Sequence, residues 1–148
     1  MATLLENKKV WHDYEILERF EAGIVLLGTE VKSLRSAHGV LAGSHVLVRG
    51  AEVYIVGMQV PAYQIANAGK DYDPSRTRKL LLTQNEIATL SGLSARKGLT
   101  IVPLSVYTKS KKIKLEIAIV KGKKKFDKRE DIKKRDDKRA IARLMRNK

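Results

Sequence analysis

The densest charge in the chain lies in its last 28 residues, 121–148. They carry nine Lys and five Arg against four Asp and one Glu, a net +9 out of the +14 of the whole chain. Apolar side chains are few there, so burial cannot offset the entropy of folding the segment alone. Ile141, Leu144 and Met145 nevertheless share one helical face, which favours a helix that forms against a polyanion. The alternative is a solvated charge run.

Four basic clusters lie beside side chains that can stack on or hydrogen-bond a nucleobase. The clusters are Asn7-Lys8-Lys9, Lys32 with Arg35, Arg76-Thr77-Arg78-Lys79, and Lys121-Gly122-Lys123-Lys124-Lys125. Their neighbours are His12 and Tyr14, Glu30 and Ser33, Tyr72, and Phe126. Lys and Arg bind phosphates without reading sequence, whereas aromatic rings stack on unpaired bases. A solvated face explains any one cluster, but four clusters together favour RNA binding.

Two of these clusters contain more specific signals. Arg76 and Arg78 alternate along an extended segment, so we expect both guanidinium groups on the same side. Glu30 is an acid among basic residues. It either caps the positive end of its own helix or accepts a hydrogen bond from a base or a 2′-hydroxyl. The sequence leaves both roles open.

Residues suited to catalysis or metal binding are poorly placed. His12, His38 and His45 lie in different predicted elements, and cysteine is absent. His12-Asp13 is the one candidate acid–base pair, but adjacent residues on a predicted strand point to opposite faces. The chain has no glycine-rich phosphate loop. We therefore expect no catalytic residue, no metal and no cofactor.

The composition points to a nucleic-acid partner. The pI is near 10.1, which favours nucleic acid first and an anionic membrane second. No run of 18 apolar residues and no signal peptide are found in the sequence. We expect a cytoplasmic protein that binds no membrane and is a monomer.

The pattern of apolar residues predicts short strands and few helices. Strands are expected over 14–20, 24–27, 46–48, 53–56, 99–107 and 113–119, with Gly50 in a tight hairpin turn. Helices are expected over 30–37 and 84–91, the second from the capping box Thr83–Glu86. A long loop covers 64–74, a length typical of functional or mobile loops.

These elements predict a mostly all-β fold in three parts. A basic N-terminal arm covers 1–12, a domain covers 13–120, and a basic tail, disordered until bound, covers 121–148. Short paired strands with two or three short helices favour an OB-like closed antiparallel β-barrel, because closure removes exposed sheet edges. An SH3-like barrel or an α+β sandwich fits the same pattern.

Taken in order, several of these stretches resemble the SsrA-binding protein family. The resemblance covers nearly the whole chain and rests on residues 7–9, 12–14, 21–24, 28–35, 73–74, 76, 78–82, 86–87, 121–124 and 127–129. One such block is weak evidence, but their shared order is specific. A departure is Phe126, where the family often has His or Tyr, so stacking is possible there but titration is not.

The resemblance implies an OB-like protein that binds the tRNA-like domain of transfer-messenger RNA (tmRNA). Such proteins support alanine charging by alanyl-tRNA synthetase and accompany tmRNA, with elongation factor Tu, to the vacant A site of stalled ribosomes. The tail then enters the empty mRNA channel as a helix. By the resemblance, the RNA-facing residues are Glu30, Lys32, Arg35, Arg76, Arg78 and Asn85. The tail residues that act in the ribosome are Asp127, Lys128, Arg129, Leu144 and Met145.

Overall fold

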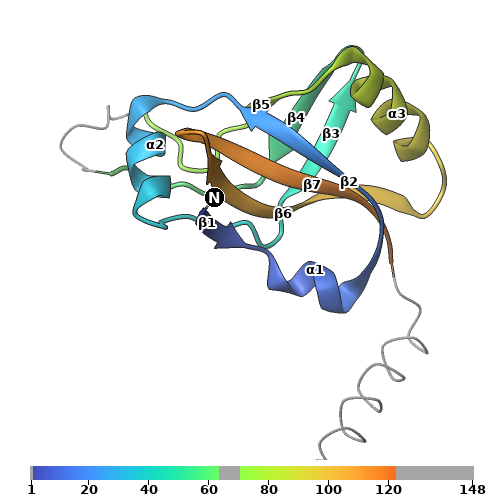
Figure 1. Cartoon of the computed structure of the whole chain (residues 1–148), viewed down its shortest axis with the longest axis horizontal. Coiled ribbons are helices and arrows are strands. Elements are labelled where there is room, and N and C mark those ends of the chain that lie inside the picture. The colour runs from blue at the N-terminus through green and yellow to red at the C-terminus, as the bar shows by residue number, and fades with distance from the viewer. Residues whose placement is uncertain (1, 64–70, 123–148) are drawn as a thin grey trace, which may run out of the picture.

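A computed structural model describes residues 2–63 and 71–122. In these residues the chain forms seven strands and three helices (Figure 1). The strands are β1 (Ala2–Glu6), β2 (Tyr14–Ile24), β3 (His45–Arg49), β4 (Glu52–Val56), β5 (Arg78–Leu81), β6 (Leu99–Lys109) and β7 (Lys112–Gly122). The helices are α1 (Lys8–Asp13), α2 (Gly28–Arg35) and α3 (Gln84–Ser94).

All seven strands join one sheet in the order β1-β6-β7-β2-β5-β4-β3, and every neighbouring pair is antiparallel. Helices α2 and α3 lie at opposite ends of the molecule (Figure 1). The expectation of a mostly β, antiparallel fold is confirmed. The expectation of a closed barrel is not confirmed, because in the described residues β1 and β3 end the ladder and do not pair with each other.

The core explains why β6 reads as apolar on both faces. Ile101 and Val106 on β6 belong to the main core, together with Leu115, Ile117 and Ile119 of β7. On the other face, a smaller cluster contains Val10, Val102, Leu104, Ala118 and Val120. The register shift between Pro103 and Ser105 lies within β6. Strand β6 is therefore covered on both sides. On β7 both sides are covered over 117–120, while Lys112 is exposed and Lys114 and Glu116 are half-buried.

The first 12 residues are not a free arm, which corrects the predicted division of the chain. Strand β1 pairs with β6, and the backbone N–H of Asn7 donates to the carbonyl of Leu104 at 2.8 Å. Val10 of α1 is only 3 % exposed and packs in the smaller cluster. The sequence did not predict this contact, because the charges of Lys8 and Lys9 suggested a solvated arm. The folded domain begins at Ala2 rather than at residue 13.

Most of the remaining elements agree with the prediction apart from their ends, but β5 was not predicted as a strand. Strand β2 covers 14–24, longer than the predicted strand 14–20, since Gly23 stays in the ladder opposite Lys114 and Leu81. The predicted strand 24–27 is wrong beyond Ile24, because residues 25–27 form no strand. Helix α2 begins two residues earlier than predicted, and Ala37 beyond its end has a φ of 58°. The capping box at Thr83 and Glu86 is present, with the Glu86 N–H donating to Thr83 Oγ1 at 3.2 Å. Gly50 has the positive φ, 63°, that the hairpin between β3 and β4 requires.

Candidate nucleic-acid interface

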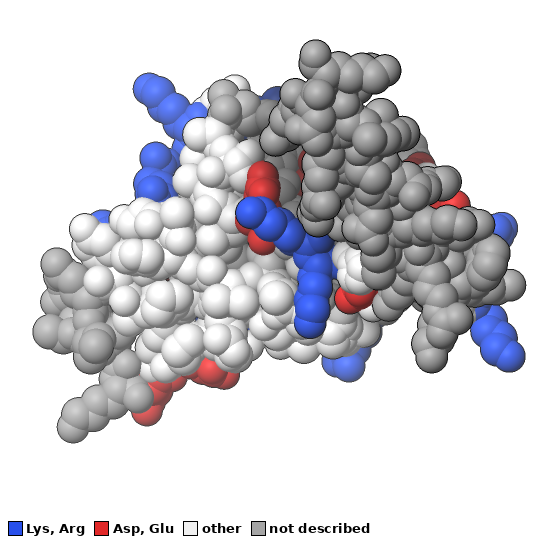
Figure 2. Space-filling model, turned by 90° about the horizontal axis from the view of Figure 1, so that it is seen from below, with Lys and Arg blue, Asp and Glu red and all other residues white. Residues whose placement is uncertain are grey.

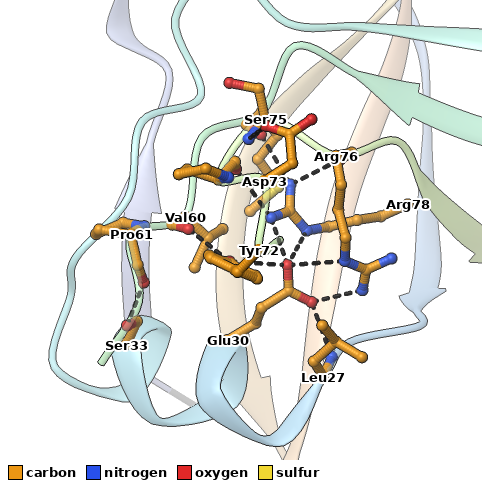
Figure 3. A network of polar contacts seen from close by, with 12 residues as sticks. Leu27, Glu30, Ser33, Val60, Pro61, Tyr72, Asp73, Ser75, Arg76 and Arg78 are labelled. Carbon is orange, nitrogen blue, oxygen red and sulfur yellow. Dashed lines mark hydrogen bonds and ion pairs between the residues drawn. The ribbon is translucent and has the colours of Figure 1, made fainter. Parts of the chain in front are cut away.

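Glu30, in the first turn of α2, gathers donors from three parts of the chain (Figure 3). Its Oε1 accepts a hydrogen bond from the Leu27 backbone N–H at 2.8 Å. Arg76 reaches the same carboxylate with Nη2 at 2.5 Å from Oε1 and Nε at 3.1 Å from Oε2. Arg78 Nε donates to Oε2 at 2.7 Å, and its Nη2 forms an ion pair with the same oxygen. Tyr72 Oη donates to Oε2 at 3.2 Å.

Two members of this cluster, Glu30 and Arg78, are internal, whereas Arg76 is partly exposed. The side chains of Glu30 and Arg78 are both 0 % exposed, and that of Arg76 is 28 % exposed. The expectation that Glu30 and Arg78 lie on an RNA-facing surface is therefore wrong. A buried charge is stable only when it is paired and hydrogen-bonded, and the two residues meet this need for each other. Both guanidinium groups do lie on the same side, as predicted, but they converge on a carboxylate.

The role of Glu30 that the sequence left open is resolved by its contacts. Accepting the Leu27 N–H is the helix-capping role, because that donor lies at the N-terminus of α2. Burial alone would raise the pKa of the Glu30 carboxyl, but hydrogen bonds from Arg76, the Leu27 N–H and Arg78 outweigh it and lower that pKa. Burial and the nearby Glu30 charge raise the pKa of Tyr72. Glu30 is therefore a carboxylate at neutral pH.

The remaining donors of Arg78 hold backbone carbonyls. Nη1 donates to the carbonyls of Met58 at 2.8 Å and Arg76 at 3.1 Å, and Nη2 donates to that of Pro74 at 3.0 Å. Arg78 thus ties the start of β5 to the segment after β4 and to the turn before itself. Together with Glu30, it fixes α2 against these segments. The cluster therefore connects α2, from inside the protein, to β5 and to the segment after β4.

Two more predicted RNA contacts are structural in the described residues. The Ser33 hydroxyl donates to the Pro61 carbonyl at 2.6 Å, and Ser33 is 0 % exposed. The Asn7 side-chain amide donates to the Pro103 carbonyl at 3.0 Å, and Asn7 is 5 % exposed. Their polar side chains anchor α2 and the β1–α1 connection. Neither residue is placed to meet a partner directly.

The other predicted contacts in the described residues are exposed, except that Tyr14 is half-buried, and they fall into separate groups. Lys8, Lys9, His12 and Tyr14 lie on or next to α1, and the ladder brings Lys121 and Gly122 beside them, because Glu15 pairs with Lys121 and Tyr14 with Gly122. His12 and Asp13 lie in helix α1, not on a strand as predicted. Figure 2 shows Lys and Arg side chains at several separate places on one face, with acidic side chains among them.

A second exposed group lies on α2. Lys32 and Arg35 are exposed, and Lys32 Nζ lies 6.0 Å from the centre of the Tyr63 ring. On β5, the exposed Lys79 lies 3.5 Å from the carboxylate of Glu52. Asn85 is exposed in the first turn of α3, at the other end of the molecule. The structure therefore brings Lys32 and Arg35 together and leaves Asn85 apart from them.

The remaining predicted residues lie outside the described part of the chain. They are Lys123, Lys124, Phe126, Asp127, Lys128, Arg129, Ile141, Leu144 and Met145. Their predicted roles stay predictions.

Sequence analysis missed the basic residues at the turn between β6 and β7. Lys111, Lys112 and Lys114 lie here, and Arg35 Nη2 donates to the Lys111 carbonyl at 3.0 Å. The signal was present as the basic face of the predicted strand 113–119. Its nearness to α2 was not visible, because the two segments are 76 residues apart in the sequence.

Within 2–63 and 71–122, no group of three or more His, Asp or Glu side chains is arranged to hold a metal ion. No helix in the same ranges is long and apolar enough to cross a membrane. The candidate site in the described residues is thus the antiparallel sheet with the exposed cations on and around it. The buried carboxylate of Glu30 holds α2 and β5 together beneath this surface.

Comparison with known proteins places this basic β platform in a family. The family model described as SmpB protein matches residues 4–147, so the chain belongs to the SmpB family. An "SsrA-binding protein" of Oleidesulfovibrio alaskensis is 51 % identical over 148 residues, covering 99 % of this chain and 94 % of that protein. One of Syntrophobacter fumaroxidans is 47 % identical over 141 residues, covering 95 % and 87 %.

A solved structure is also similar. It is described as "tmRNA-SmpB: a journey to the center of the bacterial ribosome" and is 42 % identical in sequence, with a TM-score of 0.69. The match covers 82 % of this chain and 85 % of the other. The resemblance to SsrA-binding proteins that the sequence motifs indicated is thereby confirmed.

Proposed function

We propose that this chain binds the tRNA-like domain of tmRNA and delivers it to the vacant A site of stalled ribosomes for trans-translation. The observation that carries this function is family membership over residues 4–147, together with the likeness to a tmRNA–SmpB structure at 42 % identity. The net charge of +14 suits an RNA partner. The protein is an RNA-binding factor of the cytoplasm and catalyses no reaction.

The function divides between the sheet and the tail. The sheet, with the exposed cations of α1 and α2, holds the tRNA-like domain. Residues 123–148 enter the empty mRNA channel, where Asp127, Lys128 and Arg129 meet the decoding centre and Leu144 and Met145 meet an apolar surface. Elongation factor Tu joins the complex through tmRNA, and alanyl-tRNA synthetase acts on the same RNA.

A gel-shift experiment tests the RNA partner. The full-length chain is mixed with the isolated tRNA-like domain, and ordinary tRNA is added as competitor. We expect tight binding that a large excess of ordinary tRNA does not displace. Equal competition by ordinary tRNA would indicate a general RNA-binding protein of translation and would contradict the proposal.

Truncation tests the division of labour. Deleting residues 128–148 should leave the affinity for the tRNA-like domain nearly unchanged and abolish peptide tagging on stalled ribosomes. If the affinity collapses instead, the tail is the tether and the proposed division is wrong. The variant His12→Ala tests the alternative that the protein is an enzyme using His12 and Asp13. Normal peptide tagging by this variant would exclude that alternative.

A further inference from the structure

Trp11 is the most exposed aromatic residue in the part of the chain that the structure describes. It lies in α1 and is 52 % exposed, although Trp residues in folded proteins are highly buried on average. Its neighbour Val10, by contrast, is buried and packs in the smaller cluster. Helix α1 therefore places one apolar side chain in the protein and presents a large flat one to the outside.

Arg19 holds the exposed ring from the neighbouring strand. The guanidinium group of Arg19, on β2, lies over the Trp11 ring at 4.9 Å from its centre. Arg19 Nη1 also lies 3.5 Å from the Glu116 carboxylate on β7. A cation over an aromatic face is a favourable contact, so Arg19 supports the ring while Glu116 holds Arg19. About half of Trp11 is still exposed, which leaves room for a second flat group to stack on it.

The helix that carries Trp11 is fixed to the sheet. The backbone N–H of Asn7, which precedes α1, donates to the Leu104 carbonyl at 2.8 Å. The Asn7 side-chain amide donates to the Pro103 carbonyl at 3.0 Å. Val10 packs against the same strand from the next turn. A side chain on an element that is already fixed loses little entropy when a partner binds, so Trp11 is well placed as an anchor.

The charges around Trp11 favour an anionic partner. Residues 7–12 contain two Lys and no Asp or Glu. Lys8 lies three residues before Trp11, so both are on the same face of α1. Lys8 and Lys121 are exposed, and neither forms an ion pair with another described residue. An aromatic ring beside exposed cations is the combination that stacks on an unpaired base and binds its phosphate.

Helix α1 also lies where the described chain ends. Tyr14, the residue after α1, pairs with Gly122, so residues 123–148 continue from this corner of the sheet. Figure 1 shows α1 on its own below the sheet, apart from α2. Because residues 123–148 are proposed to enter the mRNA channel, α1 is the element that approaches the small ribosomal subunit. The RNA that Trp11 meets is therefore ribosomal RNA rather than tmRNA.

We propose that Trp11, supported by Arg19, stacks on an unpaired base of the small-subunit ribosomal RNA, with a neighbouring phosphate on Lys8. This inference rests on the proposed function, because it names a ribosomal contact made during the same delivery. An unpaired base is a flat group that the exposed ring can accept, and RNA is recognised mainly at such unstacked positions. The contact holds the folded domain at the entrance to the channel that residues 123–148 enter.

Two substitutions of one residue test the stacking. Trp11→Leu keeps an apolar side chain without a flat ring, and Trp11→Phe keeps a ring. After melting curves show that both proteins fold, the affinity of each protein–tmRNA complex for stalled ribosomes is measured. The Leu variant should bind about tenfold more weakly, as expected for the loss of one stacked base, and the Phe variant within about threefold of the wild type. Equal affinities of the Leu variant and the wild type would overturn the proposal.

Chemical probing of the ribosome identifies the partner. Acylation of the 2′-hydroxyl slows when an unpaired nucleotide becomes fixed by stacking. The wild-type protein and the Phe variant should protect one unpaired nucleotide of the small-subunit RNA, and the Leu variant should leave it reactive at saturating concentration. Weaker binding by the Leu variant with an unchanged acylation pattern would indicate a ribosomal protein as the partner of Trp11, and the proposal would then be wrong.

Fluorescence separates the two possible sources of the base. Trp11 is the only Trp of the chain, so the Trp emission of the full-length protein reports on this ring alone. Addition of the isolated tRNA-like domain should leave the emission unchanged while the domain binds. Quenching at this step would place the stacked base in tmRNA and overturn the assignment to ribosomal RNA. Failure of the wild-type protein to bind the tRNA-like domain at all would instead refute the proposed function.

Discussion

Two pairs of basic residues with the same spacing in the sequence have opposite surroundings in this molecule. Arg76 and Arg78 precede and open β5, and Lys112 and Lys114 open β7. Arg76 and Arg78 turn inward onto Glu30, and Arg78 has no exposed surface. Lys112 and Lys114 line an open groove with no acid in its lining. The position of one carboxylate, rather than the pattern of the cations, decides which pair is structural and which is free to bind.

The largest expected effect is on the inward-facing pair. Glu30→Gln keeps the size of the side chain but leaves Arg78 as a buried charge without its anion. Unfolding free energy should fall by about 3–5 kcal/mol, as is typical when one partner of a buried ion pair is removed. Urea denaturation followed by circular dichroism measures it. Glu52→Gln is the matched control, because its pair with Lys79 is exposed and should contribute little.

The next effect separates stability from RNA binding. Arg78→Met removes the inner charge while Arg76 stays on Glu30, so the loss of stability should lie at the lower end of about 3–5 kcal/mol. Since Arg78 is fully buried, the salt dependence of RNA binding should keep the wild-type slope. A shallower slope, measured at a temperature where the variant is folded, would place Arg78 on the RNA and break the contrast with Lys112 and Lys114.

Acid should weaken the inward-facing cluster in a defined direction. The folded protein holds the pKa of Glu30 below its ordinary value of 4.5, so the unfolded chain binds more protons in this range. Stability from this group is therefore present above about pH 4.5 and lost as the pH falls through the folded pKa. Plotted between about pH 5 and pH 3, unfolding free energy should fall less steeply in Glu30→Gln than in the wild type. Parallel curves would show that Glu30 does not titrate as its contacts imply.

The smallest change in stability is expected at the outward-facing groove, and it has the opposite sign. Lys111→Gly suits the φ of 65° and keeps the carbonyl that Arg35 holds. Thermal unfolding should show a gain of up to about 1 kcal/mol, while affinity for the tRNA-like domain falls. Ser110→Gly relieves the neighbouring positive φ without removing a charge, so it should gain stability and keep its affinity. A loss of affinity in both variants would assign the effect to the turn's shape, not to the cation.

The sequence predicted elements well wherever the signal was local. The alternation of β7, the capping box of α3 and the Gly50 hairpin depend on neighbouring residues, and all three are present. The anchor at Leu4, Leu5 and Val10 was missed, because its partners in β6 lie about 100 residues away and its charges suggested an arm. Whether the sheet closes likewise depends on whether its two edge strands, β1 and β3, pair with each other, and short sequence patterns do not determine this.

The candidate site was predictable in composition but not in orientation. The sequence singled out Glu30, Arg76 and Arg78 in two separate clusters, and the structure brings them together. The sequence did not reveal that these charges neutralise each other, because they meet only when α2 packs against the sheet and buries them. Nor did it pair Arg35 with Lys111, because hydrogen bonds between distant segments leave no spacing to detect.

The order of strands in the sheet has a consequence for how the protein is made. Strands β1 and β2 are the first to leave the ribosome, yet each lies against a partner in 99–122, which is translated nearly last. Contacts so distant in the chain are slow to form, and at about 5–20 residues per second the early strands wait several seconds with open edges. The hairpin β6–β7 thus completes the domain late, and its loss by premature termination would leave β1 with no partner strand and β2 paired only with β5, at Gly23 and Ile24.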